Sequence, residues 1–315
     1  MSAAKRPQSR SPYVSIERAD WSDLAGSTSM PLTESELRKI RGLGDLLDLQ
    51  EVSEVYLPVS ELLSIYVKQA QMLHGNAVEF FGERAARTPF IIAVAGSVAA
   101  GKSTVSRLLR ELMQRWEGMP NVELVTTDGF LYPNKELEQR GLMGRKGFPE
   151  SYDRKRLLEF VADIKSGKSE VQAPVYSHLT YDIVEGEFTT VTTPDVLIVE
   201  GLNLLQPPAP GQEVALSDYF DFSIYIDADP ENLEQWYLSR FEQLWKTAFT
   251  NPSSYFHNLT KDLSQHQAME RARGFWSEIN LVNLKENIEP TRSRATLVMQ
   301  KGAEHRVERV LLRKI

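Results

Sequence analysis

The chain has 315 residues, 42% of them hydrophobic and 25% charged, an ordinary globular balance that leaves room for one large domain or two small ones. It contains no cysteine, which excludes disulfides, thiolate catalysis and cysteine-ligated zinc. A formal net charge of -7 gives no overall reason to bind nucleic acid or an anionic membrane surface, so basic residues should matter locally, where they meet phosphates.

The N-terminal part of the chain is predicted to be helical. Met1–Tyr13 is basic and Ser-rich without an apolar core, unlike a secretory signal. Thr33 and Glu36 form a capping-box pattern, and the helix that it begins should stop near Gly42. A second helix should begin around Pro58. We expect three regions in chain order: a flexible tail over residues 1–12, a helical extension over 13–85 packed on the core, and one larger domain over 86–315.

Strands alternate with helices from Pro89 onward. Phe90–Ala95 is a continuous apolar run, typical of a strand buried on both faces. The later elements are predicted as strands over 122–127, 196–199, 222–226, 295–300 and 307–312, and helices after residue 101 and over 153–166, 232–248 and 267–284. This alternation predicts an α/β fold, a mainly parallel sheet with helices on both faces. The longest apolar stretch, 89–100, is too short to span a bilayer, and we expect a cytoplasmic protein.

The strongest functional signal is a phosphate-binding loop, or P-loop. The segment GSVAAGKS fits the pattern G-x-x-x-x-G-K-[ST], with a strand before it and a helix after it. Its glycines allow a tight turn whose backbone N–H groups face phosphate oxygens, helped by the helix dipole. Lys102 can reach the β and γ phosphates, and the Ser103 hydroxyl can ligate Mg²⁺. The expected nucleotide-binding residues are Gly96, Ser97, Val98, Ala99, Ala100, Gly101, Lys102, Ser103 and Thr104.

Two alternatives stay open for this loop. One is a glycine-rich turn that happens to contain Lys-Ser. The other is a GTP-specific switch, although the guanine-reading pattern N-K-x-D does not occur in the sequence. The choice between ATP and GTP is not made by these residues.

Two acidic residues follow predicted strands. Asp128 comes after the strand that ends at Thr127, and Glu200 comes after Val196–Val199. Ligands of a parallel sheet collect at the carboxyl ends of its strands, beside the P-loop. A hydroxyl acceptor benefits from a carboxylate that takes its proton. We therefore expect Asp128 to be the general base and Glu200 to serve Mg²⁺ or its water shell. The two roles could be exchanged, and either acid could instead cap a helix.

At these residues the sequence resembles the bacterial type I pantothenate kinases, which belong to a P-loop kinase superfamily with uridine kinases and phosphoribulokinases. The resemblance runs from Ser11 to near the C-terminus and is most specific in its middle and late segments. The matching segments are GSVAAGKST, TTDGFLYPN, KGFPESYD, APVYSHLTYDI, LIVEGLNLLQ, DFSIYIDA, QWYLSRF and EINLVNLKENIEPTR.

The resemblance implies that residues 86–315 form a P-loop kinase domain that phosphorylates pantothenate with ATP and Mg²⁺, the first step toward coenzyme A. It also implies a homodimer and feedback inhibition by coenzyme A. By this likeness the catalytic residues are Asp128, Lys102 and Arg240. Asp128 would be the base, Lys102 the phosphate ligand, and Arg240 would neutralise charge on the transferred phosphoryl group. The resemblance implies three further roles: pantothenate binding by Tyr176, His178, Tyr181, Tyr237 and Asn280, inhibitor binding by Arg107 and His178, and adenine contact by His305. Metal binding by Ser103 and Glu200 is expected from the P-loop pattern and the strand position given above.

Several of these residues also have ordinary structural interpretations. Tyr237, Arg240, Phe241 and Leu244 share one helix face, which could line a pocket or form a core stripe with the arginine reaching solvent. Phe256 could be a pocket wall or core packing. The alternative functions are another kinase of the superfamily, such as a uridine kinase, and a non-catalytic nucleotide-binding module.

Overall fold

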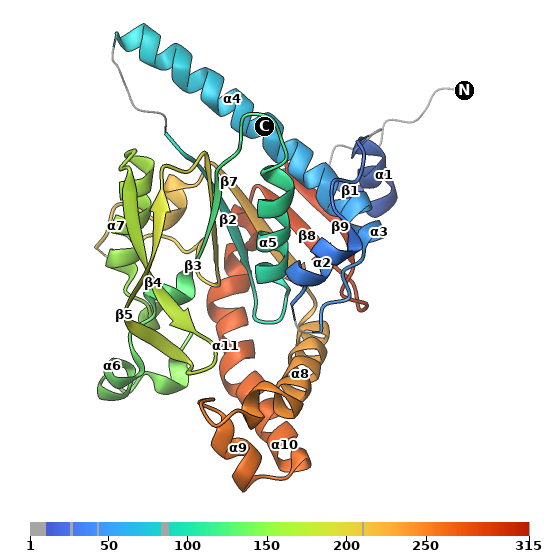
Figure 1. Ribbon diagram of the computed structural model, residues 1–315, viewed down its shortest axis with the longest axis vertical. Coiled ribbons are helices and arrows are strands. Elements are labelled where there is room, and N and C mark those ends of the chain that lie inside the picture. Colours follow the sequence, from blue (N-terminus) through green and yellow to red (C-terminus); the bar gives the residue numbers. More distant parts are fainter. Residues whose placement is uncertain (1–10, 26–27, 43, 83–87, 210, 315) are drawn as a thin grey trace.

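The computed structural model describes residues 11–25, 28–42, 44–82, 88–209 and 211–314. Most of the predicted tail and the predicted boundary at residue 85 lie outside these ranges. The centre is a seven-stranded sheet in the order β1-β9-β8-β7-β2-β6-β3, with a separate β4–β5 hairpin beside it (Figure 1). The strands are β1 Tyr13–Glu17, β2 Phe90–Gly96, β3 Val122–Thr126, β4 Glu170–Ser177, β5 Asp182–Thr192, β6 Val196–Gly201, β7 Phe222–Ala228, β8 Leu297–Lys301 and β9 Val307–Arg313.

The sheet is mainly parallel, as the sequence predicted. β2 pairs in parallel with β6 and β7, β6 with β3, and β7 with β8, whereas β9 runs antiparallel to β8 and β1. Every residue of β2 and β6 is buried, which explains the apolar runs Phe90–Ala95 and Val196–Val199. The register aligns Val94 of β2 with Glu200 of β6, and Glu200 with Thr126 of β3. The carboxyl ends of these three strands therefore meet at one edge.

Helices cover the sheet and extend beyond it. They are α1 Arg18–Ser22, α2 Glu34–Ile40, α3 Leu49–Glu51, α4 Leu57–Phe81, α5 Lys102–Met113, α6 Asn134–Gln139, α7 Arg154–Lys165, α8 Pro230–Lys246, α9 His257–Asp262, α10 Gln265–Phe275 and α11 Leu281–Asn283. In Figure 1, α5 crosses the sheet, α4 runs past its edge, and α8, α9 and α10 gather at the lower end. Within the described residues, no helix is both long enough and apolar enough to cross a membrane.

Local sequence signals account for several element ends. Thr33 and Glu36 form the predicted capping box of α2, and Pro58 lies in the first turn of α4. Asp153 caps α7 through its carboxylate, which accepts from the Arg156 N–H at 3.0 Å. The predicted helix over 267–284 begins at Gln265 and continues through wide turns to Ile288. These boundaries follow from short-range hydrogen bonds that a sequence pattern can reveal.

Two elements depart from the expectation. β1 is a strand inside the stretch that was expected to be helical, and it pairs with β9. It is an edge strand with mostly exposed residues, so its sequence lacks the alternation that marks a half-buried strand. The Tyr13 hydroxyl holds it by donating to the Ala295 carbonyl at 2.7 Å. The β4–β5 hairpin was not predicted as a separate sheet, because the exposed residues of β5 also give no clear pattern.

Candidate active site

The P-loop follows β2 and has the backbone that tight anion binding requires. Gly96, Ala99 and Gly101 all have positive φ, at 143°, 64° and 91°. A Cβ on Gly96 would lie 2.6 Å from the Ile226 carbonyl oxygen of β7, so only glycine fits there. The Ser97 hydroxyl is buried and has no hydrogen-bond partner in the described structure. The loop therefore keeps one polar group ready for a ligand.

Lys102, Ser103 and Glu200 meet directly beneath this loop. The Lys102 ammonium donates to the Ser97 carbonyl at 2.9 Å and lies 3.9 Å from a Glu200 carboxylate oxygen. The Ser103 hydroxyl donates to the other Glu200 oxygen at 3.1 Å. Burial lowers the pKa of Lys102, which Glu200 opposes, and burial raises the pKa of Glu200. Both groups are almost enclosed, so each charge depends on its partner or on a ligand.

Asp128 stands on the turn that follows β3. Its backbone N–H donates to the Thr126 hydroxyl at 3.4 Å, and its side chain is half-buried. The next residue, Gly129, packs against β4: a Cβ there would lie 2.1 Å from the Pro174 carbonyl oxygen. The Asp128 charge opposes the burial-driven lowering of the Lys102 pKa. The close approach of Gly129 to Pro174 joins the turn after β3 to the β4–β5 hairpin.

The hairpin brings a cluster of aromatic residues to this edge. Tyr176 meets the exposed His178 ring edge-on, with centroids 5.2 Å apart, and Tyr181 at 6.3 Å. Tyr181 also packs against Phe256 at 5.1 Å. Phe256 in turn packs on Phe249 of a small core, so it contacts both the aromatic cluster and the core. Burial raises the pKa of Tyr176 and of Tyr181, which keeps both phenols protonated as hydrogen-bond donors.

Lys146 is a site residue that the sequence reasoning missed. Its ammonium lies 4.0 Å from the Tyr181 ring centroid and 5.2 Å from that of Tyr176. It donates to the Asn134 side-chain oxygen and to the Tyr181 carbonyl, both at 2.6 Å. Burial lowers its pKa to about 8, although Asp182 and Asp128 oppose this shift. Lys146 begins the segment KGFPESYD, but a lysine before a glycine carries no signal of its own.

Residues of α8 and of the turn after α10 that were predicted to bind the substrate differ in how far they are buried. Burial raises the pKa of the Tyr237 phenol to about 12, and a side-chain hydrogen bond with Asn280 opposes this shift. The Tyr237 ring lies 5.6 Å from the Trp276 ring. Arg240 is exposed. Phe241 is buried against Phe249 in a small separate core. On this helix face Tyr237 packs partly against the core, Phe241 is buried and Arg240 is exposed.

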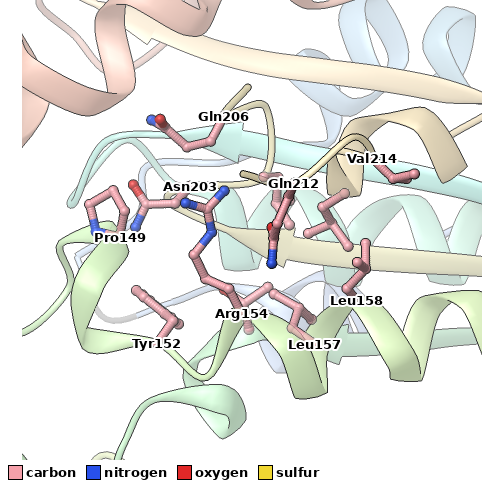
Figure 2. Close-up of a pocket in the computed structure, with 12 residues that line it drawn as sticks. Pro149, Tyr152, Arg154, Leu157, Leu158, Asn203, Gln206, Gln212 and Val214 are labelled. Atoms are coloured by element: carbon pink, nitrogen blue, oxygen red, sulfur yellow. The ribbon is translucent and has the colours of Figure 1, made fainter. Parts of the chain in front are cut away.

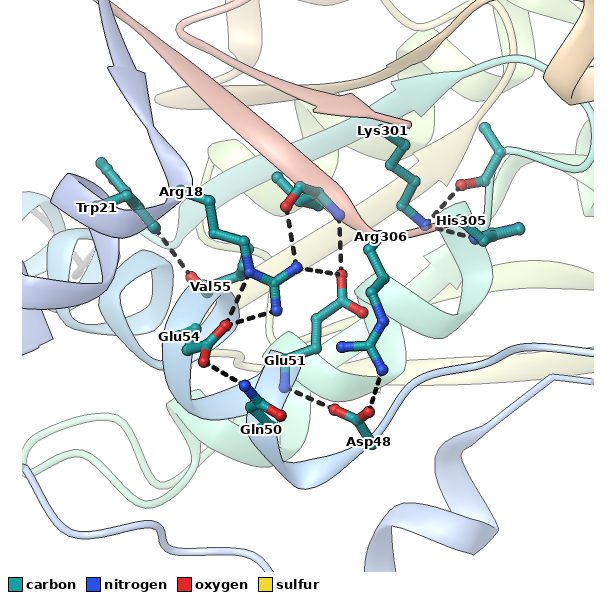
Figure 3. Close-up of polar contacts among 12 residues, drawn as sticks. Arg18, Trp21, Asp48, Gln50, Glu51, Glu54, Val55, Lys301, His305 and Arg306 are labelled. Atoms are coloured by element: carbon teal, nitrogen blue, oxygen red, sulfur yellow. Dashed lines mark hydrogen bonds and ion pairs between the residues drawn. The ribbon is translucent and has the colours of Figure 1, made fainter. Parts of the chain in front are cut away.

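The other side of the P-loop is supported by the C-terminal strands. The Lys301 ammonium donates to the Ala100 carbonyl at 3.1 Å and contacts the His305 ring nitrogen at 3.1 Å (Figure 3). Burial lowers the pKa of Lys301 to about 8 and that of His305 to about 4. His305 stacks on Trp236 with centroids 4.0 Å apart. A pocket of about 270 Å³ opens here, lined by Lys301, His305, Gly101 and Thr104 among others.

The N-terminal segment contacts this pocket as well. Arg107 of α5 donates to the Ile40 carbonyl at 2.9 Å and to the Thr104 hydroxyl at 3.1 Å. The Thr104 hydroxyl also contacts Asp45. Buried Glu51 accepts from the Val307 N–H at 2.9 Å, which ties the start of the long helical segment to β9 (Figure 3). Arg107 and His305 therefore flank the nucleotide loop, away from the tyrosine cluster.

A larger pocket lies between α7 and the loop after β6 (Figure 2). It has a volume of about 520 Å³ and an apolar floor that includes Leu157 and Leu204, with Arg154, Asn203 and Gln212 around it. Thr127 and Tyr152 also line it, so it adjoins the turn that carries Asp128. None of the predicted ligand residues lies in its lining.

These placements form three connected zones. The P-loop with Lys102, Ser103 and Glu200 can hold a triphosphate, the zone around His305 can hold its base, and the Asp128 turn with the tyrosine cluster can hold an acceptor. Among the described residues, no group of three or more His, Asp or Glu side chains is placed to hold a metal alone. A divalent ion here would take its remaining ligands from phosphates and water, as Mg²⁺ commonly does.

Comparison with known proteins points to the same chemistry. The model of the phosphoribulokinase / uridine kinase family matches residues 91–243. The chain is 61% identical over 305 residues to a pantothenate kinase of Clavibacter sepedonicus, covering 97% of this chain and 95% of that one. It is 58% identical over 316 residues to a pantothenate kinase of Streptomyces avermitilis, covering 98% and 95%. A D-glycerate 3-kinase from Cryptococcus neoformans shares the fold, with a TM-score of 0.53, 15% identity and coverage of 79% and 97%.

Proposed function

Since the chain belongs to the pantothenate kinase family, we propose that its site transfers the γ-phosphoryl group of ATP to the hydroxyl of pantothenate, the first step of coenzyme A biosynthesis. The observation that carries the proposal is the meeting of two features at one sheet edge. The P-loop follows β2, and the Asp128 turn follows β3. This turn packs on Pro174 of β4, the strand that also carries Tyr176. A kinase for a small polar alcohol needs this adjacency of phosphate site and acceptor site.

The P-loop residues fit a bound nucleotide with Mg²⁺. The unpartnered Ser97 hydroxyl and the amides of the glycine-rich turn offer donors to phosphate oxygens. Lys102 would exchange its contact with the Ser97 carbonyl for a phosphate. Ser103 and Glu200, already hydrogen-bonded to each other, would hold the metal and one of its waters. Bound Mg²⁺ supplies neutralisation of phosphate charge.

On the acceptor side, Asp128 would take the proton of the attacking hydroxyl as general base. Arg240, exposed on α8, would reach over the transferred group and neutralise its developing charge. Tyr237 and Asn280 would hydrogen-bond pantothenate, with Tyr176, His178 and Tyr181 around it. Lys146, packed on two of these rings, adds a cation for a carboxylated acceptor. The mixture of phenols, amide and cation suits a substrate with hydroxyls, an amide and a carboxylate.

The test of this function is an ADP-release assay with purified protein, ATP and Mg²⁺. Pantothenate, uridine and ribulose 5-phosphate serve as parallel acceptors at the same concentration. We expect turnover with pantothenate that far exceeds the background without acceptor. Turnover with uridine but not with pantothenate would instead assign the chain to the uridine kinase function.

We also propose inhibition by coenzyme A, with Arg107 and His178 among its contacts. Arg107 lies beside the nucleotide loop, whereas His178 borders the tyrosine cluster, so a long nucleotide-containing molecule could touch both ends of the site. Replacing Arg107 by Ala should raise the coenzyme A concentration needed for half-inhibition. An unchanged inhibition curve would remove this contact. We place the enzyme in the cytoplasm, where ATP is abundant.

A homodimer is proposed through α4. The helix carries apolar side chains that are exposed in the single chain, including Phe80 at 83%, Leu73 at 71% and Met72 at 60% exposure. Exposed apolar patches of this kind mark interaction surfaces. Light scattering should report a dimer, and Leu73→Glu should shift it toward monomer. A monomeric wild-type protein would contradict the proposal.

A further inference from the structure

One buried hydroxyl near the acceptor site has no partner. Tyr152 is 5% exposed, and its phenol oxygen makes no hydrogen bond in the described structure. Leaving a buried hydroxyl without a hydrogen-bond partner is unfavourable. Such a group therefore calls for an explanation, such as a partner that arrives with ligand binding.

The backbone around Tyr152 is fixed to the Asp128 turn. Tyr152 forms an isolated antiparallel bridge with Leu131. On either side of it, the Tyr132 N–H donates to the Ser151 carbonyl at 2.9 Å and the Asp153 N–H donates to the Phe130 carbonyl at 2.8 Å. The phenol is thus carried by a segment that moves with residues 128–132 rather than independently of them.

The side chain of Tyr152 also borders the turn that carries Asp128. It lines the same pocket as Thr127, the residue before Asp128 (Figure 2). Burial raises the pKa of its phenol well above the ordinary value, and the charges of Asp128 and Glu200 add to this shift. The phenol therefore stays protonated and acts as a donor at neutral pH.

The neighbouring carboxylates differ in what they already bind. Glu200 is occupied by Ser103 and Lys102. No hydrogen bond to the Asp128 carboxylate is found among the described residues. The Asp128 backbone is paired, since its N–H donates to the Thr126 hydroxyl and its carbonyl accepts from the Leu131 N–H at 3.2 Å. Among the described residues the Tyr152 phenol and the Asp128 carboxylate are thus both unpaired, and they lie on segments that are bridged to each other.

We propose that Tyr152 is a positioning residue whose phenol O–H donates to one carboxylate oxygen of Asp128 when the acceptor binds, leaving the other oxygen for the acceptor hydroxyl. The inference rests on the role proposed above for Asp128. A carboxylate held through one oxygen loses rotational freedom and presents the other in a fixed direction. The groups around Asp128 whose pKa values respond to its charge are Lys102, Lys146, Tyr152, Tyr176, Tyr181 and Glu200.

The test compares Tyr152→Phe with Tyr225→Phe, a matched control at a buried tyrosine of β7. We expect Tyr152→Phe to lower kcat roughly tenfold or more while the KM values for ATP and pantothenate stay within about twofold. The thermal midpoint of the free protein should not fall, because the lost hydroxyl has no partner there. The control should retain wild-type kcat.

A second background separates this inference from the base assignment. In Asp128→Asn, the added change Tyr152→Phe should have no further effect on the residual kcat, since both changes remove the same interaction. If Asp128→Asn keeps full activity, the base role itself is wrong. If Asp128→Asn is impaired but Tyr152→Phe keeps wild-type kcat, only the positioning inference is overturned. A raised KM for pantothenate at unchanged kcat would also overturn it, because the phenol would then contact the acceptor directly.

Discussion

Gly129 offers a direct test of how the acceptor site is assembled. Its φ is not in the left-handed region, so alanine meets no backbone strain there. The added Cβ would instead lie 2.1 Å from the Pro174 carbonyl oxygen and 3.1 Å from its carbonyl carbon. These are backbone atoms that cannot turn aside as a side chain can. The Asp128 turn and β4 would have to separate by roughly 1 Å to restore ordinary contact.

That displacement sets the expected effect of Gly129→Ala. A misplacement of about 1 Å at reacting groups can cost roughly 10²-fold in rate, so kcat/KM for pantothenate should fall by about that factor. Forced contacts in packed interiors also destabilise by about 1–3 kcal/mol. Nucleotide binding should be nearly unchanged, since the P-loop lies on a different strand.

The assay combines steady-state kinetics, ATP binding by calorimetry and urea unfolding. Gly144→Ala is the matched control, because a Cβ there meets nothing within 4 Å and its backbone lies outside the positive-φ region. We expect the control to behave like wild type in all three measurements. Gly129→Ala with kinetics within twofold of the control would refute the idea that this contact aligns Asp128 with the hairpin.

Three further outcomes are expected. Asp128→Ala should keep ATP affinity in calorimetry and lower kcat roughly 10²-fold, the usual scale for a lost general base. Lys102→Met should weaken both ATP binding and turnover, because its charge acts on the ground state and the transition state alike. Burial lowers the pKa of Lys146 to about 8 from 10.5, so the unfolded chain binds more protons between these values and stability rises with pH there. Urea unfolding of Lys146→Met across this window should show a smaller rise.

The sequence predicted the sheet edge better than what surrounds it. The P-loop and Asp128 follow β2 and β3, and Glu200 lies near the carboxyl end of β6. A local pattern of glycine, lysine and acid after an apolar run is enough to place them. The structure does bring Lys102, Ser103 and Glu200 into contact. Their catalytic and binding roles remain predictions for the assays above.

The surrounding residues depend on contacts between distant parts of the chain. Lys146 meets Tyr181 across 35 positions, and Lys301 meets Ala100 across 201. Lys146 begins the segment KGFPESYD and Lys301 lies outside the matching segments, and the spacing of their neighbours does not reveal that either lysine is buried. β1 escaped notice for a related reason: an exposed edge strand is specified by its partner β9 rather than by its own pattern.

The nucleotide and acceptor zones therefore differ in how they are supported by the fold. The nucleotide zone is built on the buried strand ends, where a change in β2 or β6 would disturb the core that carries them. The acceptor zone is built largely from segments outside the central sheet, namely the β4–β5 hairpin and the segment around Phe256. The hairpin meets the turn after β3 where Gly129 packs against Pro174. Changes in those segments can therefore alter the acceptor pocket while the phosphate cradle keeps its geometry. Variants such as Tyr181→Phe should accordingly raise the KM for pantothenate more than the KM for ATP. An equal rise in both KM values would show that the two zones do not respond independently.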